Sequence, residues 1–211
     1  MSGYQLTGYC VIRNFSIFRN QECCFEFPSA KLGDFLLQAY AALAPAYTKF
    51  YKMDALGKLG FLAAEVVLKD VELLTTRSPE AIAVVLSNAH ASLDTDVRYW
   101  ESTGSNASPA LFVYTLPNIV TGEICIRHGI KGENAFFITP HCDLVLLTEY
   151  TEMVLQQPGT ECCLAGWVDV MNDHHDVFLY LVKKIEGGNS MEEIRTQLQL
   201  VYQLDYGKIN S

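Results

Sequence analysis

The sequence predicts an α/β protein in which a mixed sheet is covered by helices on both of its faces. Continuous apolar runs such as residues 80–86 are typical of interior strands. Between these runs lie segments in which apolar residues recur at helical spacing. The last two predicted strands are joined by only eight residues, 169–176. A parallel crossover needs about a dozen residues or more, so these two strands are expected to be antiparallel if they pair.

The individual elements follow from the same patterns. Strands are expected at residues 6–12, 80–86, 135–139, 161–168 and 177–185. Helices are expected at residues 32–44, 53–68, 142–156 and 191–206, the first ending before Pro45 and the last capped by Ser190 or Asn189. Pro117 and Gly122 interrupt residues 110–125, which predicts two short helices there. Residues 87–108 are polar and are expected to form a loop.

Composition excludes several classes of function. The net charge of −9 argues against binding to nucleic acid or to an anionic membrane surface. The apolar stretches are too short for a membrane span, and the first residues lack the pattern of a secretion signal, so we expect a cytoplasmic protein. The seven cysteines include no C-x-x-C pair, which favours reduced thiols and predicts no zinc site. Neither a cofactor nor a metal is predicted.

One short segment has the pattern of a reactive site. Residues 139–143 (TPHCD) follow an apolar run and precede a predicted helix. The N-terminus of a helix carries partial positive charge and unpaired N–H groups, which lower the pKa of a thiol placed there. His141 and Cys142 are therefore the candidate site residues.

Several segments, taken in order, resemble the N-terminal half of β-ketoacyl synthases, which have the thiolase-like fold. The resemblance lies in residues 52–59 (KMDALGKL), 83–88 (AVVLSN), 92–96 (SLDTD), 108–118 (SPALFVYTLPN), 122–132 (GEICIRHGIKG) and 164–169 (LAGWVD). It is similar in particular to short ketosynthase-like proteins of aryl-polyene and flexirubin pathways, or of type II fatty acid synthesis. It implies one thiolase-like half over residues 1–211, with a five-stranded mixed sheet.

The same resemblance implies that the catalytic machinery is altered. Condensing members of the family use a cysteine nucleophile from the first half and two histidines, or a histidine and an asparagine, from the second half. Here the nucleophile position falls on His141, and no segment resembles the second half. The resemblance thus implies a non-condensing subunit or accessory protein of fatty acid or polyketide assembly.

The family also implies partners. Its members pair the strand before the nucleophile with its twin across a dimer axis, and residues 136–138 could do this here. A homodimer, or a heterodimer with a full-length ketosynthase, is therefore expected, and an acyl carrier protein is a further candidate partner. The net charge of −9 means that an acidic carrier would need a local basic patch to dock.

Two other functions stay open at this point. Cys142 could act as a nucleophile, or His141 as a base, in an acyl-thioester enzyme such as a 3-oxoacyl-carrier-protein synthase or an acyltransferase. Alternatively, the chain could be a small-molecule binding module with an acyl pocket and no carrier partner. Residues 173–176 (DHHD) could bind a metal, although a solvated loop is the simpler interpretation. Arg127 and His128 are expected to orient or pack rather than to catalyse.

Overall fold

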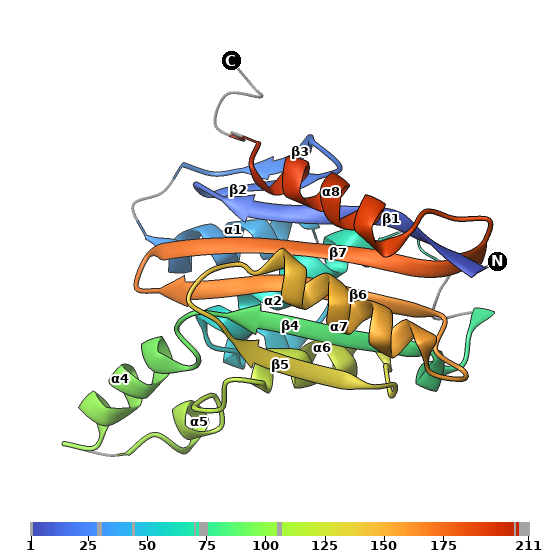
Figure 1. Cartoon of the computed structure of the whole chain (residues 1–211). Coiled ribbons are helices and arrows are strands. Elements are labelled where there is room, and N and C mark those ends of the chain that lie inside the picture. The colour runs from blue at the N-terminus through green and yellow to red at the C-terminus, as the bar shows by residue number, and fades with distance from the viewer. Residues whose placement is uncertain are drawn as a thin grey trace.

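The fold is built on one mixed sheet, seen edge-on in the computed structural model (Figure 1). The structure describes residues 2–28, 31–43, 45–69, 71, 76–104, 107–204 and 206. Within these residues the sheet has seven strands in the order β3-β2-β1-β7-β6-β4-β5. The strands are β1 (Ser2–Arg13), β2 (Ser16–Arg19), β3 (Glu22–Glu26), β4 (Ile82–Asn88), β5 (Asn134–Ile138), β6 (Cys162–Met171) and β7 (His174–Glu186).

The expected five-stranded sheet was wrong, because the N-terminal strand continues into a meander. All five predicted strands are present as β1, β4, β5, β6 and β7. Two short antiparallel strands, β2 and β3, extend the sheet beyond β1. The turns between them use positive φ angles at Asn14 and Asn20, residues that tolerate this conformation better than most. Strands of four or five residues are too short to show a clear alternation of apolar and polar residues in the sequence.

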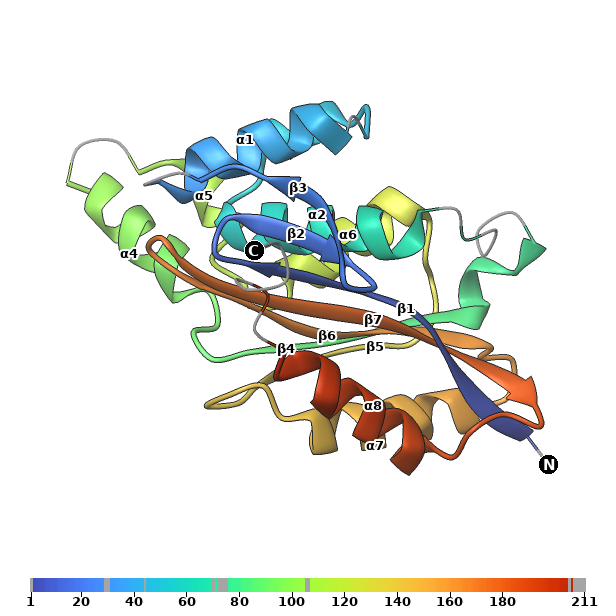
Figure 2. The same ribbon diagram turned by 90° about the horizontal axis from the view of Figure 1, so that it is seen from above.

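Helices cover both faces of the sheet, as predicted. Figure 2 shows α1, α2 and α6 on one face and α7 and α8 on the other. The helices are α1 (Leu32–Leu43), α2 (Ala55–Leu68), α4 (Leu93–Ser102), α5 (Pro109–Phe112), α6 (Ile119–His128), α7 (Leu144–Gln156) and α8 (Met191–Tyr202), with 3-10 turns at Thr48–Lys52 and Pro79–Ala81. Over the described residues, no helix has the length and apolar character needed to cross a bilayer.

Four predictions for the helices and the loop need correction or refinement. The expected loop at residues 87–108 contains the end of β4 and the whole of α4. Helix α7 begins at Leu144 rather than at residue 142, because Asp143 caps it. Helix α8 ends at Tyr202, earlier than residue 206, although Ser190 caps its start as expected and forms a capping box with Glu193. The two helices expected within residues 110–125 correspond to α5 and α6, each displaced by a few residues, but the expected interruption at Gly122 was wrong because α6 continues through it.

Strand alternation divides the interior into two cores. On β7, Val177, Leu179 and Leu181 face α1, α2 and α6, whereas Phe178 and Tyr180 face α7 and α8. All five are fully buried, as expected for a strand covered on both sides. β6 and β7 are antiparallel, as the short connection predicted, with a tight turn at residues 172–173.

The direction of the strands decides where a site can form. β4 pairs in parallel with both β5 and β6, so the carboxyl ends of all three strands meet at one edge of the sheet. The connections that leave these ends are free to vary, which is why open α/β sheets place their binding sites there. The loop at residues 139–143 leaves β5 at this edge.

Candidate functional site

The loop between β5 and α7 carries both predicted site residues but presents them differently. His141 is exposed, and its carbonyl oxygen accepts a 2.8 Å hydrogen bond from the Thr139 hydroxyl. Asp143 ends the loop, because its Oδ1 accepts 3.0 Å hydrogen bonds from the N–H groups of Val145 and Leu146. The two free N–H groups that could have stabilised an anion are therefore occupied by a carboxylate of the chain itself.

Cys142 points inward and packs against the core under α7 and α8. Burial, together with a smaller effect of the nearby Asp176 carboxylate, raises the pKa of its thiol to about 12. A hydrogen bond with Tyr202 and the charge of Arg13 act in the opposite direction but do not offset burial. A thiol in this environment stays protonated at neutral pH and is a weak nucleophile.

The neighbours of Cys142 form a closed polar cluster. Arg13 donates from Nε to Asp176 Oδ1 at 2.6 Å, and the Tyr202 hydroxyl donates to Asp176 Oδ2, also at 2.6 Å. The Arg13 guanidinium lies 4.3 Å from the centre of the Tyr202 ring and donates to the Tyr202 carbonyl oxygen at 2.8 Å. Three elements, β1, β7 and α8, are joined by these contacts. The polar residues around Cys142 thus have a structural role, which is to hold these three elements together, and no catalytic role is needed to account for them.

A second polar pair lies beside this cluster. His90, just after β4, places Nδ1 2.8 Å from Asp169 Oδ2, and the N–H groups of Ala89 and His90 donate to Asp169 Oδ1 at 3.0 Å. Asp169 lies directly opposite Asp176 in the β6–β7 pairing. Two carboxylates in this arrangement repel each other, so each needs the donors that surround it.

Sequence reasoning missed the His90–Asp169 pair. A weak signal was present, because His90 and Asp169 each follow a predicted strand, and these two strands proved to be parallel neighbours with their carboxyl ends at the same edge. If Nδ1 carries the proton that is shared with Asp169, Nε2 is left as a proton acceptor on a side chain that is 42% exposed. This arrangement could support acid–base chemistry.

The other residues singled out in the sequence have structural partners. Asp173 accepts from the Leu32 N–H at 2.8 Å, and His175 packs against the rings of Phe15 and Phe35. Asp176 turns to the opposite face toward Arg13, so residues 173–176 do not converge on one point. Arg127 forms a bidentate ion pair with Glu65 at 2.6 and 3.2 Å, and His128 Nε2 lies 3.4 Å from the same carboxylate.

Two hollows in the surface lie away from the two predicted residues. A groove of about 960 Å³ lies on the face covered by α1, α2 and α6, opposite to Cys142. A smaller hollow of about 430 Å³ lies beside α7, lined by residues that include Glu133, Tyr150 and Met153. Neither is lined by His141 or Cys142.

Comparisons place this architecture among known structures. No protein-family model matches the chain, and no curated protein matches its sequence. Among solved structures, the ishigamide ketosynthase/chain length factor matches with a TM-score of 0.63 at 16% identity, over 88% of this chain and 63% of that chain. The chain has a ketosynthase-like fold.

Two further solved structures share this ketosynthase-like fold. A complex of the ketosynthase ApeO with its chain length factor ApeC from Xenorhabdus doucetiae matches with a TM-score of 0.55 at 11% identity, over 95% of this chain and 90% of that chain. AntDE:AntF, a type II polyketide synthase acyl-carrier protein in complex with its ketosynthase, matches with a TM-score of 0.54 at 13% identity. The match covers 87% of this chain and 63% of that chain. The chain thus spans 63% of the first and third matches but nearly all of the second.

The raised pKa of Cys142 leads to a prediction about its reactivity. At pH 8 a thiol with a pKa of about 12 has roughly a thousandth of the thiolate of an ordinary thiol. We therefore expect iodoacetamide to alkylate Cys142 about a thousandfold more slowly in the native protein than in the denatured protein. Because the folded-state pKa is raised, the native rate should increase with pH up to about 12.

The exposed Cys23 serves as an internal control for this experiment. Its alkylation rate should change little between the native and denatured states, as followed by mass spectrometry of peptides. Native alkylation of Cys142 as fast as that of Cys23 would show that the thiol is activated.

Proposed function

We propose that the chain is a non-condensing, ketosynthase-like subunit that acts in the cytoplasm in fatty acid or polyketide assembly, such as aryl-polyene synthesis. It would pair with a full-length ketosynthase, which supplies the nucleophile and receives chains from an acyl carrier protein. The matched structures that contain a chain length factor or a carrier protein support this proposal.

The observation that carries the proposal is the chemistry at the start of α7. Histidine occupies the position where the family resemblance expects the nucleophilic cysteine, and its side chain is exposed. The adjacent thiol of Cys142 is buried and has a raised pKa. Asp143 occupies the N–H groups of the first helical turn, where a reacting carbonyl oxygen would otherwise find donors. A chain with these features needs another subunit to form carbon–carbon bonds.

The surface around β5 supports a partner. β5 is an edge strand of the described sheet and pairs only with β4. Strands at an edge present unpaired N–H and C=O groups, which invite pairing with another chain. Figure 1 shows α4 and α5 extending from the same side of the molecule as β5.

Exposed apolar side chains gather on this side of the fold. We call residues 93–104 and 107–116 together the apolar arm. On the arm, at the end of β5 and at the start of α7 lie eight of the fourteen large hydrophobic side chains that are exposed among the described residues: Leu93, Val97, Trp100, Phe112, Val113, Leu116, Ile138 and Val145. Such a concentration is typical of an interaction site rather than of a free surface.

A second candidate function is an acyl-thioester enzyme that uses Cys142 or His141. The His90–Asp169 pair favours it, because a carboxylate-oriented imidazole can move a proton. The burial of Cys142 weighs against it. We therefore rank the partner function first.

Co-purification tests the proposal. The tagged chain is co-expressed with each full-length ketosynthase encoded in its genomic neighbourhood, and complexes are resolved by size-exclusion chromatography with mass determination. We expect a stable complex with one of these ketosynthases, and a change in product chain length when the subunit is left out. Recovery of this chain without any ketosynthase in every combination would refute the partner function.

A further inference from the structure

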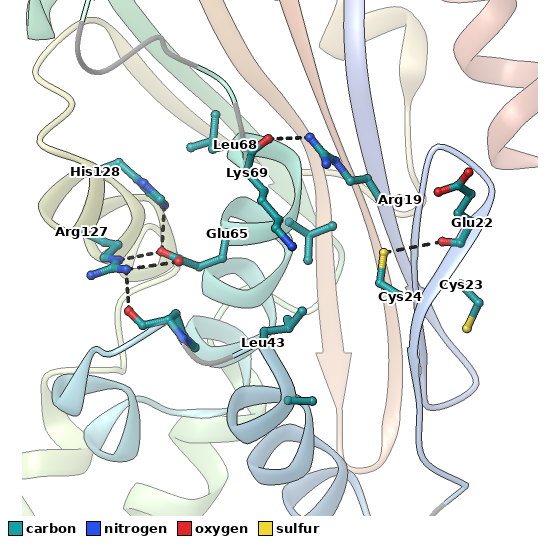
Figure 3. Close-up of a pocket in the computed structure, with 13 residues that line it drawn as sticks. Arg19, Glu22, Cys23, Cys24, Leu43, Glu65, Leu68, Lys69, Arg127 and His128 are labelled. Carbon is teal, nitrogen blue, oxygen red and sulfur yellow. Dashed lines mark hydrogen bonds and ion pairs between the residues drawn. The ribbon is translucent and has the colours of Figure 1, made fainter.

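His90 combines a fixed ring with access to solvent. Its side chain is 42% exposed, and its Nδ1 lies 2.8 Å from the Asp169 carboxylate. Other histidines of the chain differ from it in burial. His128 also faces a carboxylate, that of Glu65 in the groove of about 960 Å³ (Figure 3), but its side chain is only 9% exposed. His175 packs against two phenylalanine rings. His90 is therefore the better placed of these three histidines to act on a ligand from solvent.

The hydrogen bonds of Asp169 determine which ring nitrogen of His90 carries the proton. Asp169 Oδ1 accepts from the N–H groups of Ala89 and His90, both at 3.0 Å, so Oδ2 is the oxygen that faces the ring. An ionised carboxylate only accepts hydrogen bonds, and Nδ1 is therefore the donor in this contact. In the neutral imidazole, Nε2 then has a lone pair that can accept a proton.

The loop that carries His90 is held in one conformation by a buried amide. The Asn88 side chain donates to the Ala91 carbonyl oxygen at 2.8 Å and accepts from the Ala91 N–H at 3.0 Å. These contacts fix Ala91 at a φ angle of +51°, which alanine rarely adopts. Backbone held in such a conformation by its surroundings is concentrated at functional sites. The imidazole is thus positioned before any ligand arrives, as a catalytic base requires.

The place of His90 in the fold favours a ligand with an acyl chain. His90 follows β4 at the carboxyl edge that β4 shares with β5 and β6, where open α/β sheets bind their ligands. Ile138, which pairs with Asn88 at the end of β5, is 59% exposed. Leu93, whose N–H donates to the His90 carbonyl oxygen at 2.9 Å, is 45% exposed. Exposed apolar surface therefore lies close to His90, where an acyl chain could contact it.

We propose that His90 and Asp169 form a hydrolytic dyad that cleaves acyl thioesters. His90 Nε2 takes a proton from water while the water oxygen attacks the thioester carbonyl carbon. The C–S bond then breaks, and the imidazolium returns the proton to the leaving thiolate, so the products are a carboxylic acid and a thiol. Asp169 is a positioning residue that holds the ring and stabilises the imidazolium.

This activity is separate from both functions considered above. Neither Cys142 nor His141 takes part in it, and the partner function needs no hydrolysis. Failure of the dyad and failure of the partner function would therefore be distinguished, because the test below uses the chain alone.

Release of free hexanoic acid from the N-acetylcysteamine thioester of hexanoic acid tests the proposal. The acid itself is measured by liquid chromatography and mass spectrometry, because the exposed thiol of Cys23 can exchange with a thioester without hydrolysis. We expect release above the rate in buffer, and kcat/KM about tenfold lower for the acetyl thioester, whose chain is shorter. His90→Gln removes the base and should lower kcat about a hundredfold.

Asp169→Asn tests the positioning role. The asparagine oxygen can still accept from the two backbone N–H groups, so the loop should stay folded. Its NH₂ group then faces Nδ1 as a donor, which moves the ring proton to Nε2 and removes the base. We expect kcat to fall about a hundredfold while KM stays within about a factor of two, a split that a purely structural role would not produce.

His174→Gln is the matched control, because His174 is an exposed histidine at the start of β7. It should leave kcat and KM unchanged, and thermal unfolding checks that each variant is folded. Hydrolysis no faster than in buffer, or wild-type kcat in folded His90→Gln or folded Asp169→Asn, would overturn the proposal. Loss of hydrolysis in Cys142→Ala would also overturn it, since the activity would then belong to the thiol.

Discussion

Replacing Gly166 by alanine should destabilise the fold by about 4 kcal/mol, at the upper end of single substitutions. Gly166 lies on β6 opposite Leu179 of β7, with a φ angle of +149° that side chains rarely adopt. A Cβ atom there would overlap the backbone carbonyl oxygen of Phe178 and approach the Leu179 Cα to 2.9 Å. Backbone at the centre of a sheet cannot move aside without breaking the β6–β7 pairing. Denaturant unfolding measures the loss.

Gly122→Ala is the matched control for this substitution. Gly122 lies inside α6, and a Cβ there would meet no atom within 4 Å. Because alanine favours helix more than glycine does, this variant should gain about 0.5–1 kcal/mol. If Gly166→Ala were as stable as the wild type, the close packing of β6 against β7 would be wrong.

Ile138→Lys and Trp100→Ala should each weaken binding to the proposed ketosynthase partner about a hundredfold. Ile138 ends β5 and is 59% exposed, and Trp100 on the apolar arm is 76% exposed. Truncating an apolar side chain of this size at the centre of an interface costs about 2 kcal/mol or more of binding free energy. A hundredfold change corresponds to about 2.7 kcal/mol. Surface plasmon resonance or titration of the complex gives both affinities.

Leu200→Asp provides the control for the interface variants. Leu200 is 65% exposed on α8, on the face away from the groove helices and outside the apolar arm. Its substitution should leave partner affinity within about a factor of two, and all three variants should keep the wild-type unfolding free energy within about 0.5 kcal/mol. Equal losses of affinity in Leu200→Asp would show that the β5 side has no special role.

The sequence predicted the strands that are buried on both sides, because their apolar runs are continuous. β4, β6 and β7 are of this kind, and the short connection between the last two also identified their direction correctly. The short strands at the edge of the sheet were harder to predict from the sequence. β3 is almost entirely exposed, so burial left no pattern in its residues.

Helix α4 shows why polar composition misled the prediction of residues 87–108. Its apolar residues Leu93, Val97 and Trp100 have helical spacing, but they face outward and lie among acidic residues. A helix whose apolar residues face outward differs in sequence pattern from a helix that buries its apolar face in the core of its own chain. The proposed partner surface would account for both the missed helix and the exposed side chains.

The site was only partly predictable. The sequence located residues 139–143 between a strand and a helix, which depends on local chemistry, but it placed the start of the helix at residue 142 and missed the cap at Asp143. It could not show that Cys142 meets Arg13, Asp176 and Tyr202, because these residues come from β1, β7 and α8. Contacts between residues so distant in the chain depend on the strand order. The roles of His141 and Cys142 remain predictions.

The most direct test of the non-condensing role uses the purified chain alone. It is incubated with an acyl-carrier thioester and a malonyl-carrier thioester, and intact mass spectrometry follows both the protein and the carrier, with a full-length ketosynthase as positive control. We predict that neither an acyl adduct on this chain nor a chain-extended carrier product forms. A chain-extended product, or an acyl adduct that Cys142→Ala or His141→Ala removes, would contradict the account.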